Sequence, residues 1–430
     1  MLAPLALGGC GLWDSWFGDK KTLLPGKREP VQTGRQGLTV DDGVAKVVLP
    51  PEVRNAGWPQ AGGNPAHFMG HLATGTQLAE AWSANIGAGG GYRRKIMAQP
   101  VAADGIVYVM DSDAVVSAFD IGNGSRVWRF DTKNDEDDST NVGGGLALDQ
   151  GTLYAVNGLS ELVALDAAHG TMRWRSNFGA PARSSPTVVE GRLFLITIED
   201  RLLALTTENG RQLWQYQAAN PTTSVLGSPA PAYADGLMVA GFGSGEMAAL
   251  RAESGTVVWT DLLATTLRTG SLANFSAIRG LPVVDRGRVY AIGMAGLMVA
   301  DDLPTGRRLW ERQVSGEDSV WAAGGWLFIV SLEQKIAAVS RDDGRIAWVT
   351  QLPQWENPDK QRRPITWYGP LLVGDRLVVA GTNQQALAVS PYTGDILGQQ
   401  DLSGKASLGP IAAAGTVFVV TDDGRLLALR

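Results

Sequence analysis

Three histidines, His67, His71 and His169, are the side chains in this 430-residue chain with the widest range of possible chemistry. His67 and His71 stand four residues apart, and on a helix this spacing would place two metal ligands on one face. Pro65 and the neighbouring glycines oppose a helix here, because proline removes a backbone donor and glycine costs conformational entropy. His169 falls in a predicted hairpin. We therefore interpret all three as structural and predict no metal site.

Two further motifs have only a superficial resemblance to ligand-binding loops. The acidic run Asp135-Glu136-Asp137-Asp138 is contiguous and lacks the alternation of a calcium loop, so we expect a solvated loop. The sequence Gly241-Phe242-Gly243-Ser244-Gly245 looks like a phosphate loop, but it falls in a turn of a repeat described below. No nucleophile elbow occurs. These patterns predict a chain without catalytic residues and without a cofactor.

Composition excludes several other classes of protein. The formal net charge is −6, which argues against sequence-independent binding of nucleic acid. The sequence contains no stretch of about 18 apolar residues, so it predicts no helix that spans a membrane. Cys10 is the only cysteine, which rules out an internal disulfide and a paired-cysteine zinc site.

The position of Cys10 suggests a modification. Leu7-Gly8-Gly9-Cys10 ends a short apolar run and resembles a bacterial lipobox, in which the cysteine becomes the lipidated first residue. The resemblance implies that residues 1–9 are a signal peptide remnant, that Cys10 carries palmitate and other acyl groups, and that the destination is the outer membrane, since Asp is absent after the cysteine. Residues 10–57 contain several prolines and scattered charges without periodicity, which predicts a flexible tether.

The rest of the chain, residues 58–430, is built from repeats. Each begins with a turn glycine (Asp375 in one copy) before a β-branched or aromatic run, and an alanine follows thirteen residues later in all eight copies. Six residues after the alanine comes a second glycine, and four residues after that a tryptophan. The tryptophans in these positions are Trp128, Trp174, Trp214, Trp259, Trp310 and Trp348, whereas the seventh copy has Gly398.

One repeat predicts one four-stranded antiparallel sheet, with the tryptophan on the outermost strand. A single sheet of this size cannot bury both faces, so the tryptophan must pack on the neighbouring sheet. The last copy stops at Arg430 without its fourth strand, while Leu78–Ala84 is a fourth strand with Trp82 and no preceding partners. We therefore predict an all-β, eight-bladed propeller in which Trp82 lies in the same blade as Ala428 and an N-terminal strand closes the ring.

The pattern Ala-x-Asp-x-x-x-Gly-x-x-x-Trp, complete at Ala118–Trp128, Ala164–Trp174 and Ala300–Trp310, resembles the tryptophan-docking repeat of quinoprotein-type propellers. Trp58-Pro59-Gln60 with Gly62-Gly63-Asn64 resembles the segment that precedes the first blade in that group. Two branches compete: quinone-dependent oxidoreductases, and the BamB family of propeller lipoproteins in the outer-membrane β-barrel assembly machinery. The absence of adjacent cysteines, the lipobox, the tether and the chain length favour the BamB family.

Resemblance to the BamB family implies a non-catalytic scaffold, lipid-anchored at the periplasmic face of the outer membrane. Its partners would be the barrel-forming subunit of the assembly complex and unfolded outer-membrane proteins. The partner-binding positions of that family fall on Val225, Leu226, Gly227 and Arg279, in two of the four longer loops between blades. Those four loops are residues 131–145, 217–229, 262–280 and 351–368.

Overall fold

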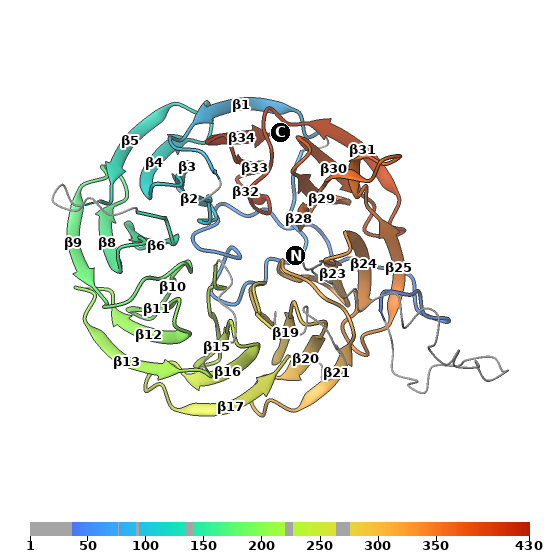
Figure 1. Ribbon diagram of the computed structural model, residues 1–430, viewed down its shortest axis with the longest axis horizontal. Coiled ribbons are helices and arrows are strands. Elements are labelled where there is room, and N and C mark those ends of the chain that lie inside the picture. Colours follow the sequence, from blue (N-terminus) through green and yellow to red (C-terminus); the bar gives the residue numbers. More distant parts are fainter. Residues whose placement is uncertain (1–36, 76, 92–93, 134–140, 220–226, 264–275) are drawn as a thin grey trace, which may run out of the picture. The chain divides into compact units, whose positions relative to one another are not determined.

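Eight four-stranded antiparallel sheets stand around a common axis, as Figure 1 shows, which confirms the predicted eight-bladed propeller. The computed structural model describes residues 37–75, 77–91, 94–133, 141–219, 227–263 and 276–430. Within these ranges no helix has the length and apolar character that crossing a membrane requires.

Each of the first four blades consists of four consecutive strands, from the axis outward. Blade 1 contains β2 (Val101–Ala103), β3 (Ile106–Met110), β4 (Val115–Asp120) and β5 (Arg126–Asp131). Blade 2 contains β6 (Gly145–Asp149), β7 (Thr152–Val156), β8 (Glu161–Asp166) and β9 (Met172–Asn177). Blade 3 contains β10 (Thr187–Val189), β11 (Arg192–Ile196), β12 (Arg201–Thr206) and β13 (Gln212–Gln217). Blade 4 contains β14 (Ala232–Ala234), β15 (Leu237–Gly241), β16 (Glu246–Arg251) and β17 (Val257–Leu262).

The next three blades repeat this order, and the eighth combines strands from both ends of the propeller. Blade 5 contains β18 (Val283–Asp285), β19 (Arg288–Ile292), β20 (Met298–Asp302) and β21 (Arg308–Arg312). Blade 6 contains β22 (Trp321–Ala323), β23 (Trp326–Val330), β24 (Lys335–Ser340) and β25 (Ile346–Gln351). Blade 7 contains β28 (Trp367–Val373), β29 (Arg376–Gly381), β30 (Gln385–Val389) and β31 (Ile396–Asp401), and a ribbon of β26 (Trp355–Asn357) and β27 (Arg362–Pro364) precedes it. Blade 8 contains β32 (Ile411–Ala413), β33 (Thr416–Thr421), β34 (Arg425–Leu429) and β1 (Glu80–Asn85).

The outer-strand tryptophans connect successive blades. Each indole packs on the second repeat glycine of the next blade, where a β-carbon would lie only 2.5–2.9 Å from the ring, as at Gly170 beneath Trp128 and Gly210 beneath Trp174. Most indole N–H groups also donate to a backbone carbonyl in the next blade, for example from Trp310 to Arg341 at 2.8 Å. Trp259, Trp310 and Trp348 are buried, and the other indoles are half-buried. The glycine is therefore required both for its positive φ and for the close approach of the indole.

Blade 8 closes the ring as predicted. β1 pairs with β34, and Trp82 lies opposite Ala428. Because β1 comes from the other end of the propeller, no hairpin joins the two outer strands of this blade. The preceding blade has Gly398 where the others have tryptophan, and the space above Gly398 is open. Blade 7, which lacks the tryptophan, thus lies next to blade 8, which lacks the hairpin glycine on which that tryptophan would pack.

A segment at the start of the propeller, residues 53–73, circles the axis and is hydrogen-bonded to every blade; we call it the crossing segment. Its bonds follow the order of the blades around the ring, beginning at blade 8. They join Asn55 to Ala414, Trp58 to Ala102, Pro59 to Leu148, Gln60 to Val188, Pro65 to Tyr233, Ala66 to Val284, Gly70 to Trp321 and Leu72 to Gly374. Its two ends, Val53 and Leu72, form a parallel bridge, so the circuit is closed.

The boundary of the propeller lies earlier in the chain than the tether prediction placed it. Residues 36–430 form one compact unit, and residues 37–57 pack on the blades. Arg312, which is 2% exposed, donates to the Asp41 carboxylate at 2.6 Å and to the Thr39 carbonyl at 3.1 Å. Side-chain to backbone bonds of this kind need no periodic pattern, which is why composition alone indicated a flexible segment here.

Candidate functional site

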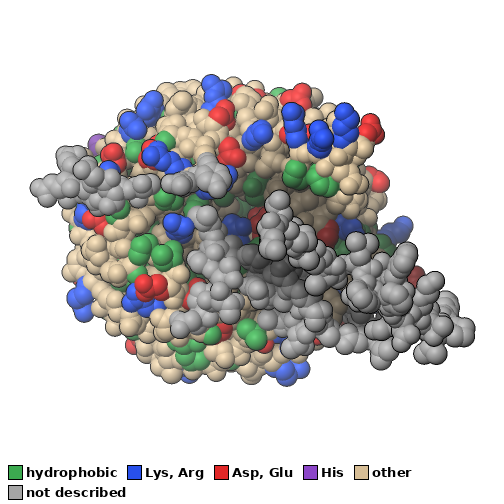
Figure 2. Space-filling model, viewed as in Figure 1, with side chains coloured by type: hydrophobic (Ala, Val, Ile, Leu, Met, Phe, Trp, Pro, Cys, Tyr) green, Lys and Arg blue, Asp and Glu red, His purple; other side chains and the backbone are tan. Residues whose placement is uncertain are grey.

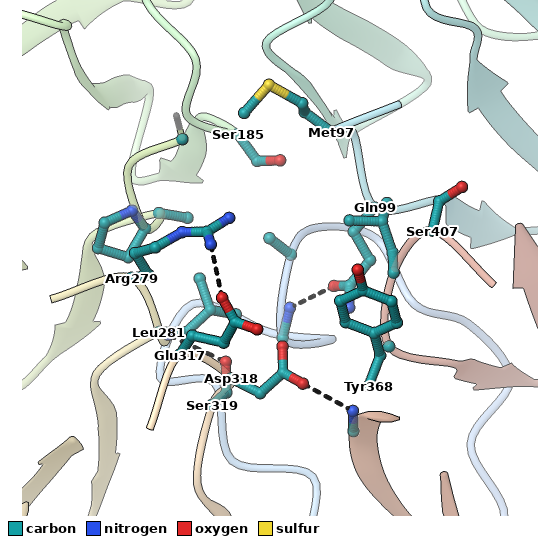
Figure 3. Close-up of a pocket in the computed structure, with 18 of the residues that line it drawn as sticks. Met97, Gln99, Ser185, Arg279, Leu281, Glu317, Asp318, Ser319, Tyr368 and Ser407 are labelled. Carbon is teal, nitrogen blue, oxygen red and sulfur yellow. Dashed lines mark hydrogen bonds and ion pairs between the residues drawn. The ribbon is translucent and has the colours of Figure 1, made fainter. Parts of the chain in front are cut away.

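A cavity of about 430 Å³ occupies the axis of the propeller, and Figure 3 shows the side chains around it. Every blade contributes through the residues that lead into its innermost strand, from Gln99 in blade 1 to Gly409 in blade 8. Trp58, Gly62 and His67 of the crossing segment also line it, and Trp58 stacks on Trp321 with the ring centroids 6.2 Å apart. The cavity is therefore built where the connections between the blades reach the axis.

Charged side chains of both signs line this cavity. Glu317 and Asp318 precede blade 6, Tyr368 lies on β28 of blade 7, and Asp422 lies in a turn of blade 8. The cations Lys95, Arg183 and Arg279 come from the segments before blades 1, 3 and 5. Across the uncovered part of the face in Figure 2, basic and acidic side chains both occur.

Hydrogen bonds fix the acidic side of the cavity. Arg279 Nη1 donates to Glu317 Oε2 at 2.7 Å, and the Gly369 amide donates to Asp318 Oδ2 at 3.0 Å, as drawn in Figure 3. Ser407 Oγ donates to Asp422 Oδ1 at 2.9 Å. These contacts hold three carboxylates toward the same space with a single arginine among them.

Burial and mutual repulsion perturb the ionisation of this group. Desolvation, with a smaller effect of the neighbouring Glu317 carboxylate, raises the pKa of Asp318 to about 7. Burial, followed by the carboxylates of Glu317, Asp318 and Asp422, also raises the pKa of Tyr368, so its phenol is protonated at neutral pH. Asp318 is therefore only partly ionised near neutral pH.

His67 adds a buried acceptor to the lining. Its Nδ1 lies 2.7 Å from the Pro282 carbonyl oxygen, and because a carbonyl only accepts, Nδ1 carries the proton. Burial lowers the pKa of His67 to about 4, and the bond to Pro282 opposes this shift only in part. Nε2 is consequently a lone-pair acceptor, and among the described residues it has no hydrogen-bond partner.

The structure brings together two of the four partner-binding residues expected from the sequence. Gly227 and Arg279 both line the cavity, and a β-carbon on Gly227, whose φ is +90°, would lie 3.8 Å from Arg279 Nη2. Val225 and Leu226 lie outside the described residues. Sequence reasoning missed Glu317, Asp318, Tyr368 and Asp422. The adjacent acids Glu317-Asp318, directly before an innermost strand, were a signal that could have indicated the axis.

The motifs set aside as structural have structural partners. The amides of Gly243 and Ser244 in the glycine-rich turn both donate to the Asp200 carboxylate of blade 3, each at 3.0 Å. His169 is exposed and binds Asp166, which also accepts a hydrogen bond from the backbone amide of His169 in the hairpin turn. The acidic run 135–138 lies outside the described residues.

Glu52, His71 and Asp375 form a group whose potential ligand atoms lie within 4.8 Å of one another. Nδ1 of His71 is 2.7 Å from the Pro50 carbonyl oxygen, and Nε2 is 2.8 Å from that of Gly374. Both ring nitrogens thus face acceptors, which leaves no lone pair directed at a cation. His71 ties the segment before the propeller to blade 7.

Similarity to known proteins covers nearly all of the propeller. The family model described as outer membrane protein assembly factor BamB matches residues 78–140, 112–350 and 353–430. The BamB proteins of Yersinia pestis and Shewanella oneidensis are 25% and 27% identical over 354 and 355 residues, which covers 81% and 80% of this chain and 87% of each relative. The BamB protein of Escherichia coli is 24% identical over 81% of this chain and 88% of its own length.

Solved structures agree on the fold. The crystal structure of BamB from Moraxella catarrhalis matches with a TM-score of 0.69 at 20% identity, over 82% of this chain and 99% of that one. The quinohemoprotein alcohol dehydrogenase of Comamonas testosteroni matches with a TM-score of 0.67 at 15% identity, over 88% of this chain and 81% of that one. Identities this low show the shared propeller alone. The family model, which spans well over half of the sequence, shows that the chain belongs to the family of the outer membrane protein assembly factor BamB.

Proposed function

We propose that this chain is a non-catalytic scaffold of the machinery that assembles β-barrel proteins in the outer membrane. Membership of the BamB family is the observation that carries the proposal. The relatives that align with this chain over more than four fifths of their own length are named as outer membrane protein assembly factors. On this proposal the chain binds the barrel-forming subunit of the complex and aids insertion of barrel proteins. Cys10 carries the lipid that anchors it at the periplasmic face of the outer membrane.

The face that carries the long connections between blades is the surface proposed to bind the barrel-forming subunit. Spacing within each blade is fixed by strand pairing, so differences in function must reside in the connections, which vary in length. Gly227 and Arg279 support this choice, because they come from two different connections and meet at the central cavity. Arg279 stays tied to Glu317 in the free protein, with its side chain 33% exposed.

Replacing the apolar pair of the 217–229 connection tests this surface. Val225→Asp with Leu226→Asp should reduce co-purification with the barrel-forming subunit by at least about tenfold, because a buried unpaired carboxylate costs several kcal/mol at an interface. Both positions fall in the sequence between β13 and β14, so we expect the melting temperature to stay nearly unchanged. Co-purified subunit is quantified from detergent extracts of cells that express each full-length variant.

The matched control places the same charges on an outer strand. Ile396 and Leu397 of β31 are 46% and 58% exposed, and Ile396→Asp with Leu397→Asp should leave co-purification intact. Equal recovery with both double variants would mean that the subunit binds elsewhere. The connection 351–368 with Lys360, Arg362 and Arg363 would then be the next surface to test. Failure of the unaltered chain to recover the subunit would contradict the proposed function.

A further inference from the structure

The acidic side of the central cavity presents more hydrogen-bond acceptors than donors, because three carboxyl groups line it beside the single phenol of Tyr368. Glu317 and Asp318, which precede blade 6, and Asp422 of blade 8 present carboxylate oxygens, and the only cation bonded to them among the described residues is Arg279. His67 adds a lone pair at Nε2, buried and without a partner in the described part of the chain. A ligand for this wall must therefore supply several N–H donors and a positive charge.

We infer that the central cavity binds the guanidinium group of an arginine side chain presented by a protein partner, on the wall formed by Glu317, Asp318, Tyr368 and Asp422. Guanidinium matches this wall because it offers five N–H donors in a planar fork, which pairs with carboxylates and stacks on aromatic rings. The ring of Tyr368 stands beside the carboxylates in Figure 3 and can take such a stack.

The ionisation of Asp318 also favours a cationic ligand. Asp318 lies deep in the channel yet keeps part of its surface open to the cavity, and its pKa is raised to about 7 by burial. A carboxyl group that is costly to ionise alone is stabilised in its charged form by a cation that arrives with hydrogen-bond donors. Arg279 meets this need only in part, because its charge opposes the rise in the pKa of Asp318 while its guanidinium is bonded to Glu317.

The volume of the cavity and the other cations that line it set the limits of the ligand. About 430 Å³ holds one long side chain with its flanking backbone but not a folded element. Lys95 and Arg183 line the cavity from blades 1 and 3, so a ligand with only positive charge would meet them unfavourably. A partner segment with one arginine and otherwise neutral or acidic residues can pair with the carboxyl groups without being repelled by Lys95 and Arg183.

Binding of two short peptides to the full-length protein tests the inference. The probes are a neutral capped heptapeptide with one central arginine and the same peptide with citrulline, which keeps the shape and removes the charge. Fluorescence anisotropy of labelled peptide should show arginine binding at least about tenfold tighter than citrulline, the discrimination expected for a charge-assisted bidentate contact. Equal binding of the two peptides, or binding of neither, would overturn the inference.

Asp318→Asn is the informative variant, because the amide oxygen can still accept from the Gly369 amide and the fold is preserved. It should weaken arginine-peptide binding by about tenfold or more, a typical loss when one charged partner is neutralised. Asp342→Asn is the matched control, since the Asp342 side chain is 83% exposed and lies outside the cavity, and it should bind like the unaltered chain. Undiminished binding by Asp318→Asn would contradict the assignment.

This inference rests on the proposed function, because a protein partner must present the arginine, but the two can fail separately. A chain that recovers the barrel-forming subunit but ignores the arginine peptide would refute the cavity assignment and leave the scaffold role intact. A chain that binds the arginine peptide but never recovers the subunit would refute the scaffold role instead.

Discussion

At the scale of single residues, His67 shows how a polar group can be structural and still face a functional cavity. Its Nδ1–H is committed to the Pro282 carbonyl, 215 residues away in the sequence. The flanking glycines and Pro65 were sufficient to predict that no helix forms here and that His67 has no helical metal partner. They could not predict the bond to Pro282, because that contact exists only once the ring of blades has formed.

Ionisation of His67 makes a specific contribution to stability. Its pKa is about 4 in the folded protein and 6.5 when solvated, so between these values the unfolded chain binds more protons. The free energy of unfolding is therefore not reduced by His67 above pH 6.5, and it falls as the pH drops from 6.5 toward 4. Between pH 7 and pH 5 this loss is about 2 kcal/mol. Asp318 shifts in the opposite direction, so only a comparison with a His67 variant isolates the effect.

We predict that His67→Gln, which removes the titrating group, reduces the decrease in the free energy of unfolding between pH 7 and pH 5 by about 2 kcal/mol. Urea unfolding of both proteins at pH 7 and pH 5 measures the difference, and Asp318 is common to both and cancels. Identical pH dependence in the two proteins would show that the imidazole is open to protons in the folded state.

At the scale of elements, closure of the propeller depends on two segments from the same end of the chain. β1 completes the sheet of blade 8, and the crossing segment ties the inner strands of all eight blades. The sequence predicted β1 because its tryptophan matches the repeat pattern. The crossing segment lacks any period, since each of its bonds reaches a different blade, and it could be found only in the structure.

Deleting residues 75–86 should expose the edge of β34 and lead to aggregation, because an unpaired apolar strand is a template for association. Size-exclusion chromatography of the deletion variant checks this, and a synthetic peptide of residues 77–86 added during refolding should restore the monomer. A deletion variant that elutes as a monomer and melts like the intact chain would show that β1 is dispensable for closure.

At the scale of the whole molecule, the fold was predictable and the site was only partly so. The spacing of thirteen residues to the alanine in eight copies, with the tryptophan following in six of them, predicted the blades, because each blade is assembled mostly from residues close in sequence. Glu317, Asp318, Tyr368 and Asp422 belong to three different blades, and their meeting at the axis follows from ring closure rather than from any local pattern. Gly227 and Arg279 were anticipated only through resemblance to a family.

The central claim is that this propeller is a scaffold of outer-membrane protein assembly. Its most direct test is a native mass spectrum of the complex purified in detergent from the protein's own membranes. If the chain is such a scaffold, the spectrum will show the mass of the chain with the barrel-forming subunit, a chain that begins at a diacylglyceryl-modified Cys10, and no bound quinone. A chain without that subunit, carrying a quinone and reducing an electron acceptor when an alcohol is supplied, would contradict it.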